Sequence, residues 1–113
     1  FALIVKGTGS YLSTIQEQLI PTEYSLSQNY PNPFNPETRI SYDLSEAGEV
    51  SLIVYDILGR SIATLVNEFK TPGRYNVLWN GNDILGNPVG SGVYLYQLRS
   101  NSFTKTKKMV ISR

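Results

Sequence analysis

The sequence predicts an all-β protein, an antiparallel β-sandwich of about seven strands preceded by an extended proline-rich segment. Short runs of alternating or β-branched residues recur at a spacing of roughly 8–12 residues, which is typical of sandwiches. Clusters of glycine, proline, asparagine and aspartate separate these runs, and no stretch shows a convincing helical period. The length of 113 residues suits a single domain with one hydrophobic core.

The first clear strand is Thr38–Leu44, where Ile40, Tyr42 and Leu44 alternate with polar residues and define an inward face. In the run 74–79 the same alternation points Trp79 inward, so we expect this indole to be buried. One alternative is a helical turn within 55–65, where apolar residues have a loose helical spacing. The remaining expected strands cover residues 50–55, 62–69, 92–99 and 103–112.

Four of the six prolines lie in residues 21–37, and the stretch Asn29–Pro36 cannot be helical. We interpret this proline-rich segment as an ordered linker held against the domain by Tyr30 and Phe34. The chain then divides into three parts. Residues 1–20 are the end of a preceding domain, or a strand for a partner, plus a linker. Residues 21–37 form the proline-rich segment, and residues 38–113 form the sandwich.

Composition argues against most catalytic chemistry. The chain has no cysteine and no histidine, which excludes disulfides, Ser-His-Asp triads and metal sites built on either residue. The acidic residues mostly flank turns, so no carboxylate pair indicates a glycosidase. Oxygen ligands for calcium are conceivable at Asn80, Asn82 and Asp83, but these residue types are common in turns for conformational reasons. We therefore expect no enzyme activity, no metal and no cofactor.

The basic residues gather at the C-terminal end of the sequence. Residues 99–113 hold half of the ten lysines and arginines and contain no acid. In a strand, Lys105 and Lys107 share one face and Lys108 lies on the other. One interpretation is an edge strand that lysine protects from self-pairing; another is a basic strand offered to an acidic partner. Neither the net charge of +1 nor any known motif indicates nucleic-acid binding. No apolar run reaches the ~20 residues of a transmembrane helix.

The five residues at the start of the chain are all apolar. A strand formed by Phe1, Ala2, Leu3, Ile4 and Val5 would have to be covered on both faces. It would suit the last strand of a preceding domain or a strand donated to a neighbouring copy.

Five motifs in order resemble a known family. They are the proline-rich segment itself, Val54-Tyr-Asp-Ile-Leu-Gly-Arg60, Trp79-Asn-Gly81, Ser91-Gly-Val-Tyr-Leu-Tyr96 and Lys107-Lys-Met-Val-Ile-Ser-Arg113. Together they resemble the type A C-terminal sorting domains of the type IX (Por) secretion system. They are also similar to the immunoglobulin-like domain of flagellar hook-capping proteins.

The resemblance implies an immunoglobulin-like fold and a non-catalytic domain that directs a larger protein across the outer membrane to the cell surface. The implied partner is the outer-membrane secretion machinery, recognised through the Gly59-Arg60 turn and the terminal strand. Two alternatives stay open. One is a subunit of an extracellular fibre or adhesin, assembled with copies of itself by N-terminal strand donation; the other is a carbohydrate-binding module with aromatic platforms. The residues expected to meet the secretion machinery are Gly59, Arg60, Lys105, Lys107, Lys108, Met109, Val110 and Arg113.

Overall fold

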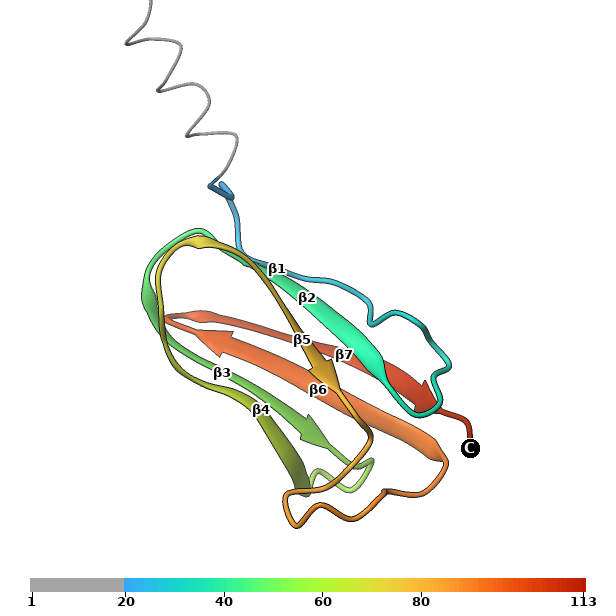
Figure 1. The fold of residues 1–113 in the computed structure, drawn as a ribbon. Helices are drawn as coiled ribbons and strands as arrows, with labels where there is room; N and C mark the ends of the chain where they lie inside the picture. The colour runs from blue at the N-terminus through green and yellow to red at the C-terminus, as the bar shows by residue number, and fades with distance from the viewer. Residues whose placement is uncertain (1–19) are drawn as a thin grey trace, which may run out of the picture.

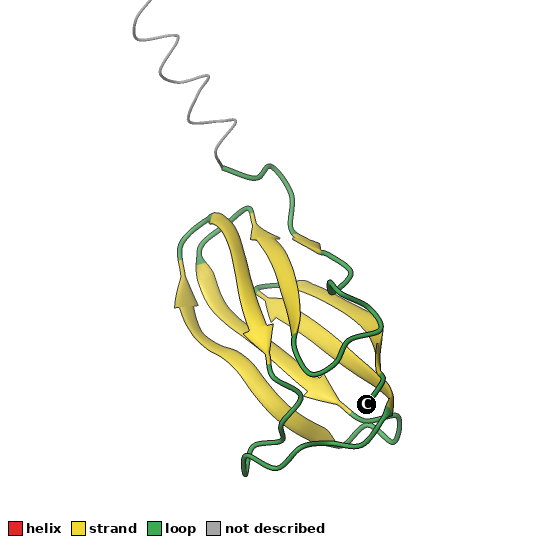
Figure 2. Ribbon diagram, turned by 45° about the vertical axis from the view of Figure 1, so that its right-hand side comes forward, coloured by secondary structure: helices red, strands yellow, loops and turns green. Residues whose placement is uncertain are grey.

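A computed structural model describes residues 20–113 of the chain. The described part contains seven strands and no helix, as Figure 1 and Figure 2 show. All strand pairings are antiparallel, so the all-β prediction is confirmed. The strands are β1 (Ser25–Leu26), β2 (Thr38–Leu44), β3 (Gly48–Tyr55), β4 (Ser61–Lys70), β5 (Gly73–Trp79), β6 (Gly92–Ser100) and β7 (Phe103–Ile111).

The strands form two sheets packed face to face (Figure 2). One sheet has the order β1-β2-β5 and the other has the order β4-β3-β6-β7. The chain passes from the first sheet to the second after β2, returns for β5, and crosses again to β6. This connectivity places β7, the last strand, at an edge of the four-stranded sheet.

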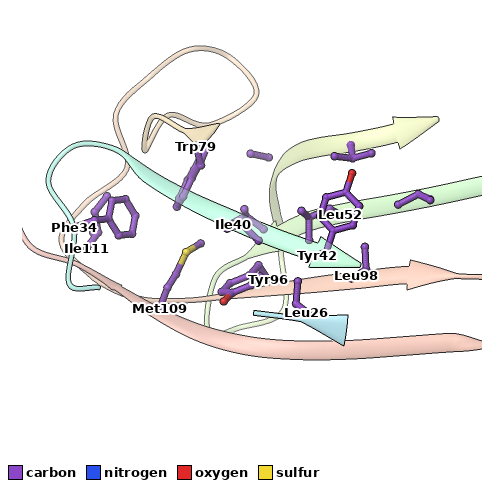
Figure 3. Close-up of a cluster of buried hydrophobic side chains, with 14 of the residues drawn as sticks. Leu26, Phe34, Ile40, Tyr42, Leu52, Trp79, Tyr96, Leu98, Met109 and Ile111 are labelled. Atoms are coloured by element: carbon purple, nitrogen blue, oxygen red, sulfur yellow. The ribbon is translucent and has the colours of Figure 1, made fainter. Parts of the chain in front are cut away.

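The core lies between the two sheets, and strict alternation along β2 and β3 supplies much of it. Ile40, Tyr42 and Leu44 are buried as the two-residue period predicts. Trp79 is 2% exposed, and its indole Nε1 donates a hydrogen bond to the Asn82 carbonyl at 2.9 Å. Figure 3 shows Trp79 beside Phe34, whose ring centroid is 5.7 Å away.

The helical turn considered for residues 55–65 is not formed. Residues 56–60 make a tight turn, and β4 follows without interruption. The register of β4 against β3 shifts twice, because Leu52 pairs with Val66 but Ile53 pairs with Thr64. Each shift adds an unpaired residue to β4, as in a β-bulge. The apolar residues of β4 therefore show a three-residue spacing that imitates a helix.

Only one of the two aromatic residues expected to hold the proline-rich segment does so. Phe34 is buried with 2% of its surface exposed, whereas Tyr30 is 80% exposed. The Tyr30 backbone pairs with Arg39, donating to and accepting from it at 2.9 and 2.8 Å. That pairing turns the Tyr30 side chain away from the core, so the prediction for this residue was wrong.

The position of Trp79 yields a stability prediction. Trp79→Ala should lower the free energy of unfolding by ~3–5 kcal/mol, because it empties the space that a large buried aromatic fills. Denaturant titration of the purified chain measures this directly. Leu85→Ala, at a residue that is 81% exposed, is the control and should stay within ~0.5 kcal/mol of the parent. Equal losses in the two variants would contradict the described core.

Candidate partner-recognition surface

The proline-rich segment closes one open side of the sandwich, and the hydroxyl of Tyr96 anchors it there. Tyr96 lies on β6 and is fully buried. Its hydroxyl accepts a hydrogen bond from the Asn29 N–H at 2.8 Å and donates one to the Ser27 carbonyl at 2.7 Å. Burial raises the pKa of Tyr96 to about 12, against a smaller opposing effect of the Asn29 N–H. The hydroxyl therefore stays protonated and donates throughout the physiological range.

The side chains of Asn29 and Thr38 hold the next turn of the segment, at Pro31, by hydrogen bonds. Both residues are buried. The Asn29 Nδ2 group donates to the Thr38 hydroxyl at 2.9 Å and to the Pro31 carbonyl at 3.1 Å. The Thr38 hydroxyl donates to the same carbonyl at 2.9 Å. Buried polar groups need such partners, and here the segment and the first residue of β2 supply them.

Beyond this turn the segment docks on the outer edge of β7. The Phe34 N–H donates to the Val110 carbonyl at 3.1 Å, and the Phe34 carbonyl accepts from the Ser112 N–H at 3.0 Å. The Val110 N–H donates to Asn32 Oδ1 at 2.9 Å. A parallel bridge joins Phe34 to Ile111. The terminal strand is an edge strand of its sheet, as one sequence interpretation proposed, but its edge is already occupied along the C-terminal half.

The terminal strand places its predicted recognition residues in different environments. Lys105 and Lys108 are exposed, and Lys107 and Val110 are half-buried. Met109 is 0% exposed and packs in the core, as Figure 3 shows. Its side chain is thus out of reach of any partner while the sandwich is folded, because inward positions of β7 alternate with outward ones.

Arg113 is tied to the loop between β5 and β6. Its Nη2 donates to the Gly81 carbonyl at 2.9 Å and its Nε to the Val89 carbonyl at 2.7 Å. The Arg113 N–H donates to Ser91 Oγ at 3.0 Å. Gly81 has a φ of 79°, and a Cβ there would lie 2.7 Å from Arg113 Nη2. The glycine is required both for the turn and for the close approach of the guanidinium.

Asp56 organises the turn that contains Gly59 and Arg60. Its Oδ1 accepts hydrogen bonds from the Leu58 and Arg60 N–H groups, both at 2.9 Å. Its Oδ2 accepts from Arg60 Nε at 2.7 Å. These interactions, the Arg60 N–H first among them, hold the pKa of Asp56 below its usual range. Gly59 completes the turn with a φ of 85°.

Sequence reasoning missed a second turn built in the same way. Asp83 Oδ1 accepts from the Leu85 N–H at 3.0 Å and the Asn87 N–H at 2.9 Å, and Gly86 has a φ of 88°. The signal was available, because both turns read Asp-Ile-Leu-Gly, at 56–59 and 83–86. Asp83 therefore has a conformational role in its own turn, as aspartate commonly has.

The two turns display their apolar residues at the same end of the sandwich, opposite the point where the chain enters it (Figure 1). Ile57 and Leu58 are 70% and 75% exposed, and Ile84 and Leu85 are 79% and 81% exposed. A hydrogen bond from the Ile84 N–H to the Ile62 carbonyl, 3.0 Å long, ties the second turn to β4. A turn of this kind needs only the aspartate and the glycine, so the turn itself does not explain these aliphatic side chains.

The charged residues among the predicted recognition residues thus lie at two places on the surface. Arg60 and Ser91 both line a surface hollow of about 310 Å³, and Arg113 reaches the same place through Ser91. Lys105, Lys107 and Lys108 lie at the second place, farther back along β7. The hollow is lined by Asp56, Ile57, Leu58, Arg60, Ser91, Gly92, Val93 and Tyr94.

Three further sequence expectations concern strand donation, metal binding and membrane-spanning helices. Strand donation by Phe1–Val5 lies outside the described residues. Within residues 20–113, no three or more acidic side chains gather into a group able to hold a metal ion. Over the same span, the fold contains no helix of the length and apolar character needed to cross a membrane.

The fold is an immunoglobulin-like β-sandwich of seven strands whose open side is closed by its own proline-rich segment. The model of the secretion system C-terminal sorting domain matches residues 28–112. The chain therefore belongs to this family, the sorting domains of type IX secretion. Members belong to proteins secreted to the cell surface or the extracellular space, and the sorting-domain family is non-catalytic.

Solved structures with the same fold include three informative cases. Dimeric latent PorU from Porphyromonas gingivalis is 19% identical, with a TM-score of 0.62 over 79% of this chain and 9% of PorU. PorZ, a surface component of the type IX secretion system of the same organism, is 22% identical, with a TM-score of 0.54 over 80% of this chain and 11% of PorZ. FlgD from P. aeruginosa is 21% identical, with a TM-score of 0.53 over 81% of this chain and 68% of FlgD.

No curated protein matches the sequence. The chain spans about a tenth of the length of PorU and of PorZ. At these identities the likeness establishes the shared fold alone.

The contribution of the Tyr96 hydroxyl to stability can be tested by removing its oxygen atom. Tyr96→Phe should lower the free energy of unfolding by about 1–3 kcal/mol, because the buried Asn29 N–H then lacks its acceptor. Denaturant titration gives the value. Tyr94→Phe is the matched control, since its hydroxyl donates one exposed hydrogen bond to the Gly90 carbonyl. The control should lose no more than the ~0.5–1.5 kcal/mol of an ordinary hydrogen bond.

The raised pKa of Tyr96 predicts an alkaline loss of stability. An exposed tyrosine in the unfolded chain ionises near pH 10, whereas burial holds the folded pKa of Tyr96 at about 12. Its contribution is complete below pH 10 and declines as the pH rises towards 12, because the unfolded state then binds fewer protons. Tyr96→Phe should flatten the decline in the free energy of unfolding. Tyr30→Phe, at an exposed residue, should leave the parent's slope unchanged.

Proposed function

We propose that this domain directs the larger protein that carries it through the outer membrane to the cell surface. The observation that carries the proposal is the family match over residues 28–112. The match to the type IX sorting family supports this function over that of a fibre subunit or a carbohydrate-binding module. Catalysis and cargo activity would belong to other parts of that larger protein.

The surface proposed to meet the secretion machinery consists of the exposed members of the sequence prediction. Arg60, Lys105, Lys108 and Arg113 are exposed, and Arg113 is also bonded to the loop between β5 and β6. The described salt bridges involve Asp56 with Arg60, Glu68 with Lys70 and Asp43 with Arg74, so none of them neutralises a terminal-strand lysine. These lysines are thus available to an acidic partner. Gly59 supports the surface by shaping the Arg60 turn, Lys107 and Val110 border it, and Met109 supports it from the core.

The fold also constrains how the sorting signal can be tested. Removing residues 107–113 would delete Met109 and Ile111, both fully or almost fully buried. Such a truncation would damage the core and could not separate recognition from folding. Charge reversal at exposed lysines changes the surface and leaves the core intact.

The test is export of a periplasmic reporter fused to the whole 113-residue chain, in a host with working type IX machinery. The parent fusion should appear at the cell surface. In the Lys105→Glu/Lys108→Glu variant, most of the reporter should stay in the periplasm, because two exposed positive charges of the terminal strand become negative. The control is Arg39→Glu, a charge reversal at an exposed arginine of the other sheet that takes part in none of the described salt bridges. A parent fusion that stays in the periplasm would refute the sorting function.

A further inference from the structure

The outer edge of β7 has a regular supply of backbone hydrogen-bonding groups. In an antiparallel strand, the N–H and C=O of alternate residues point to the same side. Val110 and Ser112 present theirs to the proline-rich segment, and the Lys108 carbonyl accepts from Gln28 Nε2 at 2.7 Å. The even-numbered residues of β7 therefore face away from β6. By the same alternation, so do the backbone groups of Thr104 and Thr106.

This edge already accepts an extended segment over half of its length. The proline-rich segment lies along Lys108–Ser112 and makes a parallel bridge at Phe34 and Ile111. Its hydrogen bonds to β7 reach no farther back than the Lys108 carbonyl. Before that point the segment pairs with β2 as β1, and Tyr24 stacks on Phe103 at the start of β7 with ring centroids 4.9 Å apart. Both backbone groups of Thr104 and Thr106, and the Lys108 N–H, have no partner among residues 20–113. We call this stretch, Thr104–Lys108, the open edge.

The open edge is surrounded by positive charge. Lys105 and Lys107 lie on one face of β7 and Lys108 on the other, and Arg99 on β6 is paired with Thr104. Residues 99–113 contain no acid. Two copies paired along this edge would bring lysines together, which disfavours self-association. An acidic strand would instead meet opposite charges on both of its faces.

We propose that the open edge binds an extended acidic segment of a partner protein as an added β-strand. The inference rests on the proposed sorting function, because it assigns that segment to the secretion machinery. Backbone hydrogen bonds to Thr104, Thr106 and Lys108 hold the added strand, and the lysines select acidic side chains. The five residues offer about 17 Å of edge, at ~3.4 Å per residue. The docked proline-rich segment sets one end of this stretch.

The first experiment maps binding on the purified 113-residue chain by NMR. The probe is a capped hexapeptide, Glu-Val-Glu-Glu-Val-Glu, and the control is the peptide with lysine in place of glutamate. At a concentration ten times its Kd, the acidic peptide should slow exchange of the Thr104, Thr106 and Lys108 amides about tenfold. Binding should weaken as salt is added. Shift changes at lysine side chains without protection of these amides would overturn the proposal.

A pair of variants at one residue separates the backbone from the side chain. Thr106→Pro removes an outward N–H and no bond to β6, a place where edge strands accept proline. It should weaken peptide binding about tenfold, which is the effect of one to two hydrogen bonds. Thr106→Ala keeps the N–H and should bind within about twofold of the parent. Equal affinities for the two folded variants would contradict strand addition, and if Thr106→Pro does not fold, the amide map of the parent decides.

The export assay then links the open edge to sorting. With the reporter fusion, Thr106→Pro should reduce surface delivery and Thr106→Ala should not. If the parent itself is not exported, the sorting function fails while the peptide result stands. If the parent is exported and the peptide protects the open edge, normal export of Thr106→Pro shows that the secretion machinery does not use strand addition there.

Discussion

The closure of the sandwich by the proline-rich segment depends on a buried hydroxyl, that of Tyr96. It satisfies an N–H and a carbonyl of a segment almost 70 positions away in the sequence. Prolines in this segment cannot donate to a sheet ladder, so strand pairing holds it only at β1 and at the single bridges of Tyr30 and Phe34. Tyr96, with Asn29 and Thr38, provides the fixed points instead. Phe34 then reaches the end of the core beside Trp79.

This closure divides the last strand into two parts with different roles. From Lys108 to Ser112 the strand is fixed on both sides, and Met109 and Ile111 belong to the core. From Thr104 to Thr106 its outer backbone groups have no hydrogen-bond partner among residues 20–113, and lysines lie beside them. One strand can therefore complete the fold and still offer a surface. The family's terminal motif overlaps the structural half, which explains why packing and recognition are difficult to separate by deletion.

At the opposite end of the molecule, the residues that fix the backbone of a turn differ from those that the turn exposes to solvent. In both Asp-Ile-Leu-Gly turns, the aspartate accepts two backbone N–H groups and the glycine adopts a positive φ. These two residue types fix the backbone, and the two between them are free to vary. Arg113 also reaches this end and holds the loop that carries the second turn. The chain end and both turns are thus part of one loop system.

Local patterns in the sequence predicted six of the seven strands, their inward faces and the family, but not the two-residue strand β1. Alternation along residues 38–44 and 74–79 is a local property of an extended chain, so the burial of Ile40, Tyr42, Leu44 and Trp79 could be predicted. Tertiary structure decided the rest. Four features depend on partners distant in the sequence. They are the bulges in β4, the exposure of Tyr30, the hydrogen bonds of Arg113 to the β5–β6 loop and the half-covered edge of β7. Gln28 and Lys108, 80 positions apart, meet only when both sheets are assembled, and no local pattern records such a contact.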